Sequence, residues 1–235
     1  MATFVLVHGS WAGAWCWSKV SPLLRGEGHA VYEQTLTGMA DRSHLASRRV
    51  DLSTHVADVV NTIRYAGDRV VLVGHSYAGF VVTGVADKIP GSISRLIYLD
   101  ANIPKTDRSS LFGDFSEIDR RTYKEEVRRR GDGWKLPKMK EFGPPAYDLS
   151  KAALRMMYSL GTPQPVRTYT ERLALRGRYK AVPRTFIKCD WPTNPFDVGS
   201  LKDQGMQVVT IKSGHWPMIS RPRVLARILS RAAAE

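Results

Sequence analysis

Cysteine is scarce in this chain of 235 residues, which contains only Cys16 and Cys189. Two cysteines cannot form the disulfide framework that replaces a hydrophobic core in small secreted proteins. We therefore expect both thiols to be reduced, which favours a cytoplasmic protein.

Long apolar runs are also missing, and none reaches the roughly 18 residues that span a bilayer. The first apolar run covers about five residues and ends in His8 and Gly9, which predicts a strand and not a signal peptide. Hydrophobic residues make up 43% and charged residues 24% of the chain, which excludes disordered, collagen-like and coiled-coil proteins. We expect a globular protein that does not interact with membranes, and the composition leaves a homo-oligomer open.

Acidic residues are few: 22 Asp and Glu stand against 35 Lys and Arg, and the net charge is +13. Such a charge raises the possibility of a nucleic-acid partner. However, residues 101–181 hold 18 of the basic and 10 of the acidic residues, and segment 120–130 mixes both signs. That mixture predicts the solvated face of a helix, with an anion-binding surface as the alternative. Without a zinc-finger, RNA-binding or basic-zipper motif, nucleic acid is not an expected partner, although the charge could steer anionic substrates to the protein.

Apolar strands alternate with helical patterns over most of the chain. Strands are predicted at residues 3–8, 30–36, 69–74, 95–100, 184–189 and 207–212, and helices at 15–26, 53–66, 78–88 and 221–234. Ser53 or Thr54 is the expected cap of the second helix. This alternation indicates an α/β protein with a mostly parallel sheet of about six strands and helices on both faces. Ligands of such sheets bind at the carboxyl edge of the strands.

The alternation stops between residues 104 and 181, where helical patterns and turns such as 131–133 and 143–145 replace it. We predict a core domain of residues 1–103 and 182–235, with residues 104–181 inserted as a helical lid over the carboxyl edge. The aromatic and Met residues of this segment could line a substrate pocket or fill the core of the lid. They are Phe112, Phe115, Trp134, Met156, Met157 and Tyr158.

Segment 71–80 has the sequence VLVGHSYAGF, in which a strand enters a tight turn that carries Ser76 and continues as a helix. Such a turn exposes the serine hydroxyl at the sheet edge, as in the motif Gly-x-Ser-x-Gly. Here Ala78 occupies the last position of the motif and Gly79 follows it. Ser76 is therefore the candidate nucleophile, and the alternative is a tight turn with a spectator serine.

The first strand ends in His8 and Gly9, followed by a loop of small residues that can direct a backbone N–H toward Ser76. We predict an oxyanion hole formed by the N–H groups of Ser10 and Tyr77. Because His8 lies within this loop, we expect it to be structural.

A serine nucleophile needs a base within hydrogen-bond distance. Of the six histidines, His8, His75 and His215 lie at predicted strand ends, whereas the other three have no such context. We expect His75 to point away from the serine hydroxyl, which leaves His215, in the loop after the last strand, as the candidate base.

These motifs together resemble the α/β-hydrolase superfamily, and within it the small esterases that include plant salicylate methylesterase-type proteins, hydroxynitrile lyases and bacterial relatives. The resemblance covers residues 3–232 and is weakest in the lid. It is carried by the segments 4–17 (FVLVHGSWAGAWCW), 74–79 (GHSYAG), 98–104 (YLDANIP) and 214–218 (GHWPM). It implies the α/β-hydrolase fold, a serine nucleophile and neither a cofactor nor a metal.

The acid of the triad has two candidates at strand ends, Asp100 and Asp190. In the plant enzymes the acid lies three residues beyond a cysteine in the loop after the fifth strand, and this chain has Pro192 there. Segment 191–196 is more similar to bacterial relatives that use the aspartate of a Leu-Asp-Ala element. The resemblance therefore favours Asp100, with Asp190 as the alternative.

The predicted activity is hydrolysis of a small carboxylic ester through a Ser-His-Asp triad and an acyl-enzyme. Trp11 and Trp216 adjoin the predicted site in sequence and are further pocket candidates. Alternatives on the same fold are a small-molecule receptor, a cofactorless oxygenase or cyclase, and a hydroxynitrile lyase. Resemblance implies that the lyase needs a threonine and a lysine where this chain has Gly9 and Trp216.

Overall fold

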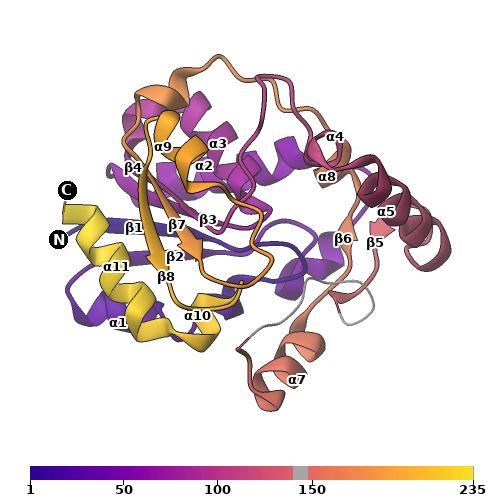
Figure 1. Cartoon of the computed structure of the whole chain (residues 1–235), viewed down its shortest axis with the longest axis horizontal. Coiled ribbons are helices and arrows are strands. Elements are labelled where there is room, and N and C mark those ends of the chain that lie inside the picture. Colours follow the sequence, from indigo (N-terminus) through magenta and orange to yellow (C-terminus); the bar gives the residue numbers. More distant parts are fainter. Residues whose placement is uncertain (140–147, 235) are drawn as a thin grey trace.

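A parallel sheet of six strands forms the centre of the protein in a computed structural model that describes residues 1–139 and 148–234 (Figure 1). The strand order is β2-β1-β3-β4-β7-β8, and every neighbouring pair is parallel. The strands are β1 Thr3–Val7, β2 Ala30–Gln34, β3 Val70–His75, β4 Ile93–Leu99, β7 Arg184–Cys189 and β8 Gln207–Ile211. This arrangement confirms the predicted sheet and places its carboxyl ends on one edge.

Helices cover both faces of the sheet, because central strands such as β3 are buried over their whole length. On one face α1 (Ser21–Gly26) packs beside α11 (Pro222–Ala234), and on the other α2 (Leu52–Ala66) packs beside α3 (Ala78–Lys88) (Figure 1). Shorter helices complete the core: η1 Ala14–Trp17, η2 Ala40–Leu45, η3 Pro90–Ser92, α9 Val198–Asp203 and α10 Pro217–Ser220. No helix in the described part of the chain is long and apolar enough to cross a membrane.

The start of α2 differs from the prediction that Ser53 or Thr54 caps it. Asp51 is the N-cap: its carboxylate accepts the Thr54 backbone N–H, and the Thr54 hydroxyl accepts the Asp51 N–H. This reciprocal pair satisfies two backbone donors that the first turn leaves unpaired. The buried face of α2 then carries the apolar residues Val56, Val59, Val60 and Ile63, at the spacing seen in the sequence.

Most of residues 104–181, called the insertion below, lies at one side of the sheet, and its last residues run back over the core to α3 (Figure 1). Their elements are α4 Leu111–Asp114, α5 Glu117–Arg130, β5 Lys135–Leu136, α7 Lys151–Leu160, β6 Gln164–Pro165, α8 Arg167–Thr170 and η4 Arg178–Ala181. Besides the expected helices, the insertion contains the short antiparallel pair of β5 and β6. The predicted turn at 143–145 lies outside the described residues, and the domain boundaries remain a prediction.

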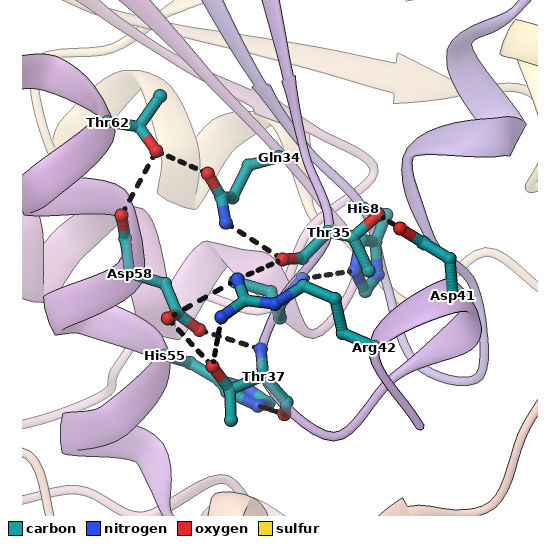
Figure 2. A network of polar contacts seen from close by, with 10 residues as sticks. His8, Gln34, Thr35, Thr37, Asp41, Arg42, His55, Asp58 and Thr62 are labelled. Atoms are coloured by element: carbon teal, nitrogen blue, oxygen red, sulfur yellow. Dashed lines mark hydrogen bonds and ion pairs between the residues drawn. The ribbon is translucent and has the colours of Figure 1, made fainter. Parts of the chain in front are cut away.

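A polar network holds the loop after β2 against α2 (Figure 2). Asp58 of α2 accepts hydrogen bonds from the backbone N–H and the hydroxyl of Thr37, at 2.7 and 2.8 Å. Arg42 lies 3.6 Å from the same carboxylate and donates to the carbonyl of Thr35. The backbone hydrogen bonds between strands end with β2, and these side-chain bonds hold the loop that follows. The loop passes close to the carboxyl edge of the sheet.

Two fully buried histidines belong to this network, and both are held in the neutral form (Figure 2). The Nδ1–H of His8 donates to the carbonyl of Gly9, and its Nε2 accepts the backbone N–H of Leu36. The Nε2–H of His55 donates to the carbonyl of Thr37 at 2.9 Å. Burial lowers the pKa of each ring to about 4, which agrees with the expected structural role of His8.

The low pKa values of His8 and His55 predict a loss of stability in mild acid. The unfolded chain binds a proton on each ring near pH 6.5, whereas the folded chain does so near pH 4, so the stabilisation is complete above pH 6.5 and declines down to about pH 4. Each ring contributes about 3 kcal/mol to this pH dependence. Urea unfolding between pH 7.5 and 4.5 measures it. We expect a shallower slope in His55→Gln and the wild-type slope in His44→Gln, whose side chain is exposed. Equal slopes in all three proteins would contradict the assignment.

Candidate active site

Ser76 occupies the turn between β3 and α3 with a left-handed backbone, at φ +55°. The turn is held by the hydrogen bond from the Ser76 N–H to the Leu99 carbonyl and by the bond from the Asn102 N–H to the Ser76 carbonyl. A side chain at Gly79 would place its Cβ 2.1 Å from the Asn102 carbonyl oxygen, so glycine is required there. Ala78 is fully buried, and its methyl group fits the position where the usual motif has glycine. The strained conformation presents the Ser76 side chain at the carboxyl edge.

The loop after β1 packs directly against this turn. A Cβ on Gly9 would lie 2.9 Å from the Cβ of Ser76 and 2.8 Å from the Nδ1 of His75. The hydrogen bonds among the described residues leave the backbone N–H groups of Ser10 and Tyr77 without a protein acceptor. Two such donors beside a serine can bind the oxygen of a tetrahedral intermediate.

His215, in the loop after β8, is buried and pairs with Asp100, which follows β4. The distance between its Nδ1 and Oδ2 of Asp100 is 2.7 Å. The carboxylate accepts the Nδ1–H, which leaves Nε2 free to accept a proton. This arrangement is the one that a histidine base needs.

Asp100 is fully buried, with a left-handed backbone at φ +45°. Besides His215, its carboxylate accepts the Cys189 N–H at 3.1 Å, the Trp191 Nε1–H at 2.8 Å and the Asn194 amide at 2.6 Å. Burial raises the pKa of Asp100, but the hydrogen bonds from His215, Trp191 and Cys189 outweigh it, and the net pKa is lowered. The carboxylate therefore stays ionised at neutral pH.

Asp190, the alternative acid, has a different environment. It follows β7, its backbone N–H donates to the Ile211 carbonyl, and its side chain is exposed. Of the two candidates, the structure therefore brings Asp100 to the Nδ1 of His215.

His75 supports the loop that carries His215. Its Nε2–H donates to the His215 carbonyl at 2.7 Å, and the two rings lie 4.6 Å apart. Burial, together with the neighbouring His215, lowers the pKa of His75 well below its usual value. A neutral His75 places no positive charge beside the His215 ring.

A cavity of about 400 Å³ joins these residues. The core lines it from the strand ends, and the insertion lines it from α4, α5 and α8. The lining residues are Ser10, Trp11, Ser76, Asp100, Asn102, Leu111, Phe115, Asp119, Tyr123, Tyr169, Trp191, Pro195, Phe196 and His215.

In the described part of the chain, no group of three His, Cys, Asp or Glu residues could hold a metal ion, and both cysteines are buried and free.

The pocket candidates divide into two groups. Trp11 and Phe115 line the cavity, whereas Trp216, Phe112, Trp134, Met156, Met157 and Tyr158 are not among its lining residues. Trp216 is buried against the His75 ring, with centroids 5.0 Å apart. Trp134 packs under Lys135 and Arg48, and Met157 is fully buried in the core. A residue's closeness in sequence to a site residue therefore did not show whether its side chain faces the cavity. Its presence in the insertion did not show this either.

Other lining residues were not expected from the sequence. Trp191, Pro195 and Phe196 follow β7, and their position after a predicted strand at the carboxyl edge was the signal that could have identified them. Asp119, Tyr123 and Tyr169 come from the insertion, where no periodicity or motif marks the residues that turn toward the core.

Comparisons with known proteins agree with this geometry. A model of the "Alpha/beta hydrolase family" matches residues 4–228. The carbendazim hydrolyzing esterase of Nocardioides sp. (strain SG-4G) is 36% identical over 98% of this chain and 99% of the relative. Methyl jasmonate esterase 1 of Vitis vinifera is 26% identical over 96% and 94% of the two chains.

Among solved structures, an extracellular alpha/beta-hydrolase from a Paenibacillus species superposes with a TM-score of 0.87. The match covers 100% of both chains at 22% identity, and a likeness at this identity shows the shared fold. The family model and the bacterial esterase, which match nearly the whole chain, extend the likeness from fold to family. The chain therefore belongs to the alpha/beta hydrolase family, and it is a carboxylesterase-type hydrolase.

Proposed function

We propose that the protein hydrolyses small esters with a flat aromatic or cyclic acyl part, through Ser76, His215 and Asp100. The observation that carries this proposal is the pairing of His215 with the buried Asp100, in the cavity that also contains the strained Ser76. A cavity of about 400 Å³ is suited to a small molecule. Its aromatic lining (Trp11, Phe115, Tyr123, Tyr169, Trp191 and Phe196) favours a flat, apolar group.

The mechanism follows from the direction of the hydrogen bonds. Asp100 holds the His215 Nδ1–H, so Nε2 accepts the Ser76 hydroxyl proton while Oγ attacks the ester carbonyl. The N–H groups of Ser10 and Tyr77 bind the oxyanion, an effect of about 3–4 kcal/mol for one donor. The protonated His215 next gives its proton to the leaving alcohol. Water, activated by His215 in the same way, then releases the acid and restores Ser76.

Replacement of the nucleophile tests the proposal. Ser76→Ala removes the hydroxyl oxygen proposed to form the acyl-enzyme, and we expect a loss of activity of at least about 10³-fold with the fold intact. The substrates are a p-nitrophenyl ester series together with methyl jasmonate and carbendazim, after which two relatives are named. Turnover by a folded Ser76→Ala protein at the wild-type rate would refute the proposal. A folded wild type that binds these esters without turnover would favour the receptor alternative.

A matched pair of variants tests the acid. Asp100→Asn leaves the size of the side chain but places an amide opposite His215, which disfavours the required tautomer, and we expect a fall in kcat of about 10²–10⁴-fold. Asp190→Asn makes the same change at the exposed candidate, and we expect nearly wild-type kcat. The reverse result would assign the acid to Asp190. Circular dichroism of both variants shows whether each retains the fold.

The charge of the cavity favours neutral or cationic esters over anionic ones. Among the described residues of the insertion, no Lys or Arg lines it: Arg121 pairs with Glu117, and Arg128 pairs with Glu125 at 2.7 Å, on the exposed side of α5. Asp119 of the same helix does line the cavity, and its carboxylate accepts the Ser116 hydroxyl at 2.6 Å. The net positive charge attracts anionic substrates to the protein, but the negative charge of Asp119 repels them in the cavity.

Esters of one shape and different charge test this preference. We expect kcat/KM to rank methyl 4-(aminomethyl)benzoate and methyl 4-methylbenzoate above monomethyl terephthalate. Asp119→Asn should raise kcat/KM for the anionic ester and lower it for the cationic ester, each by about fivefold at low salt, the effect of about 1 kcal/mol. Glu117→Gln makes the same charge change on α5 outside the cavity lining, and we expect it to alter the ranking little. A wild type that prefers the anionic ester would contradict the preference.

A further inference from the structure

The insertion holds the loop after β1 at several points. The Trp11 backbone N–H donates to the Gln164 side chain at 3.3 Å, and the Trp11 carbonyl accepts the Thr162 N–H at 3.1 Å. Trp11 has a left-handed backbone at φ +62°, a conformation that a tryptophan keeps only when its surroundings impose it. Just before it, the Ser10 hydroxyl shares a hydrogen bond with the hydroxyl of Tyr169, from α8.

Tyr169 also packs on the residue that follows the nucleophile. Its ring is stacked on that of Tyr77, with centroids 5.4 Å apart and an interplanar angle of 1°. The far end of Tyr77 is held as well, because its hydroxyl donates to Nδ1 of His55 at 2.9 Å. Tyr169 is 3% exposed, and its ring therefore has little freedom to shift against either partner.

A single side chain of the insertion thus contacts both residues whose N–H groups are assigned to the oxyanion hole. We propose that Tyr169 is a positioning residue, whose hydroxyl sets the Ser10 loop and whose ring sets Tyr77. This inference rests on the proposed function. An oxyanion hole accelerates the reaction only when its donors are held in place before the charge develops, and small displacements are costly. The strained loop at Ser10 and Trp11 needs such support.

The surroundings of Tyr169 also connect the hole to the substrate. On the insertion side its ring lies 6.2 Å from that of Phe115 and 6.1 Å from that of Tyr123, and all three line the cavity. A substrate seated on these rings therefore touches the same side chain that positions the oxyanion donors.

Tyr169→Phe tests the hydroxyl while keeping the ring stack. We expect kcat to fall about tenfold, less than the loss of a whole donor, with KM within about twofold of the wild-type value. A trifluoromethyl ketone forms a hemiketal with the nucleophilic serine and places an oxyanion in the hole. Its inhibition constant should rise by the same factor as kcat/KM falls. Because the ketone must first be shown to require Ser76, using Ser76→Ala, failure of the proposed function is seen separately.

Two further variants distinguish positioning from general packing. Tyr98→Phe removes another buried hydroxyl, which bonds to Thr83 in the core, and should lower thermal stability while leaving kcat unchanged. Ser10→Ala keeps its backbone N–H and removes the partner of Tyr169. If the two hydroxyls act through one bond, the double variant loses no more activity than either single variant. The inference would be overturned if the losses of the two single variants multiplied in the double variant, or if Tyr169→Phe changed KM alone. An equal loss of kcat in Tyr98→Phe would also overturn it.

Discussion

The site depends on a negative charge that is buried without access to water. The Asp100 carboxylate is compensated by donors from three places: the end of β7, the loop that follows it, and His215 after β8. Burying an ion is costly unless its hydrogen bonds are complete, and these donors meet that need. They can converge only because β4, β7 and β8 are parallel neighbours whose carboxyl ends share one edge. The order of the strands thus allows the Asp100 carboxylate to be buried as an ion. The carboxylate in turn orients the His215 ring.

The insertion adds side chains to the cavity next to these groups. The core carries the residues proposed as nucleophile, base, acid and backbone donors, whereas the insertion contributes five of the described residues that line the cavity. The same segment contributes Tyr169, Gln164 and Thr162 to the support of the loop after β1. The segment that lines the cavity therefore also supports the loop of the proposed oxyanion donors. In the described part of the chain no Lys or Arg lines the cavity, and on α5 Arg121 and Arg128 pair with glutamates of the same helix.

Local patterns in the sequence predicted the sheet, the position of Ser76 in its turn and the loop that carries His215. Each depends on a few consecutive residues, such as a buried strand followed by small residues, so short-range rules suffice. The choice between Asp100 and Asp190 does not follow from such rules. Both come directly after a strand, and the outcome depends on the left-handed backbone of Asp100 and on donors about 90 residues away in sequence.

Side chains that face the cavity from the insertion were the least predictable part. Trp216 is next to His215 in sequence and packs beneath it, whereas Tyr169 is distant and contacts two site residues. A periodicity shows which face of a helix is apolar, but not which neighbour that face meets. The basic segment of α5, in contrast, was predictable, because its charges of both signs already indicated a solvated helix.

The proposed reaction requires that Ser76 form a covalent acyl-enzyme, and mass spectrometry of a trapped adduct detects this step. The protein is incubated with a fluorophosphonate ester, from which a nucleophilic serine displaces fluoride. The phosphonyl group that remains on the serine is hydrolysed too slowly for turnover. We expect one added phosphonyl group in the intact mass, located on Ser76 after digestion, with activity lost in proportion to labelling. An adduct on another residue, or full activity in protein fully labelled at Ser76, would contradict it.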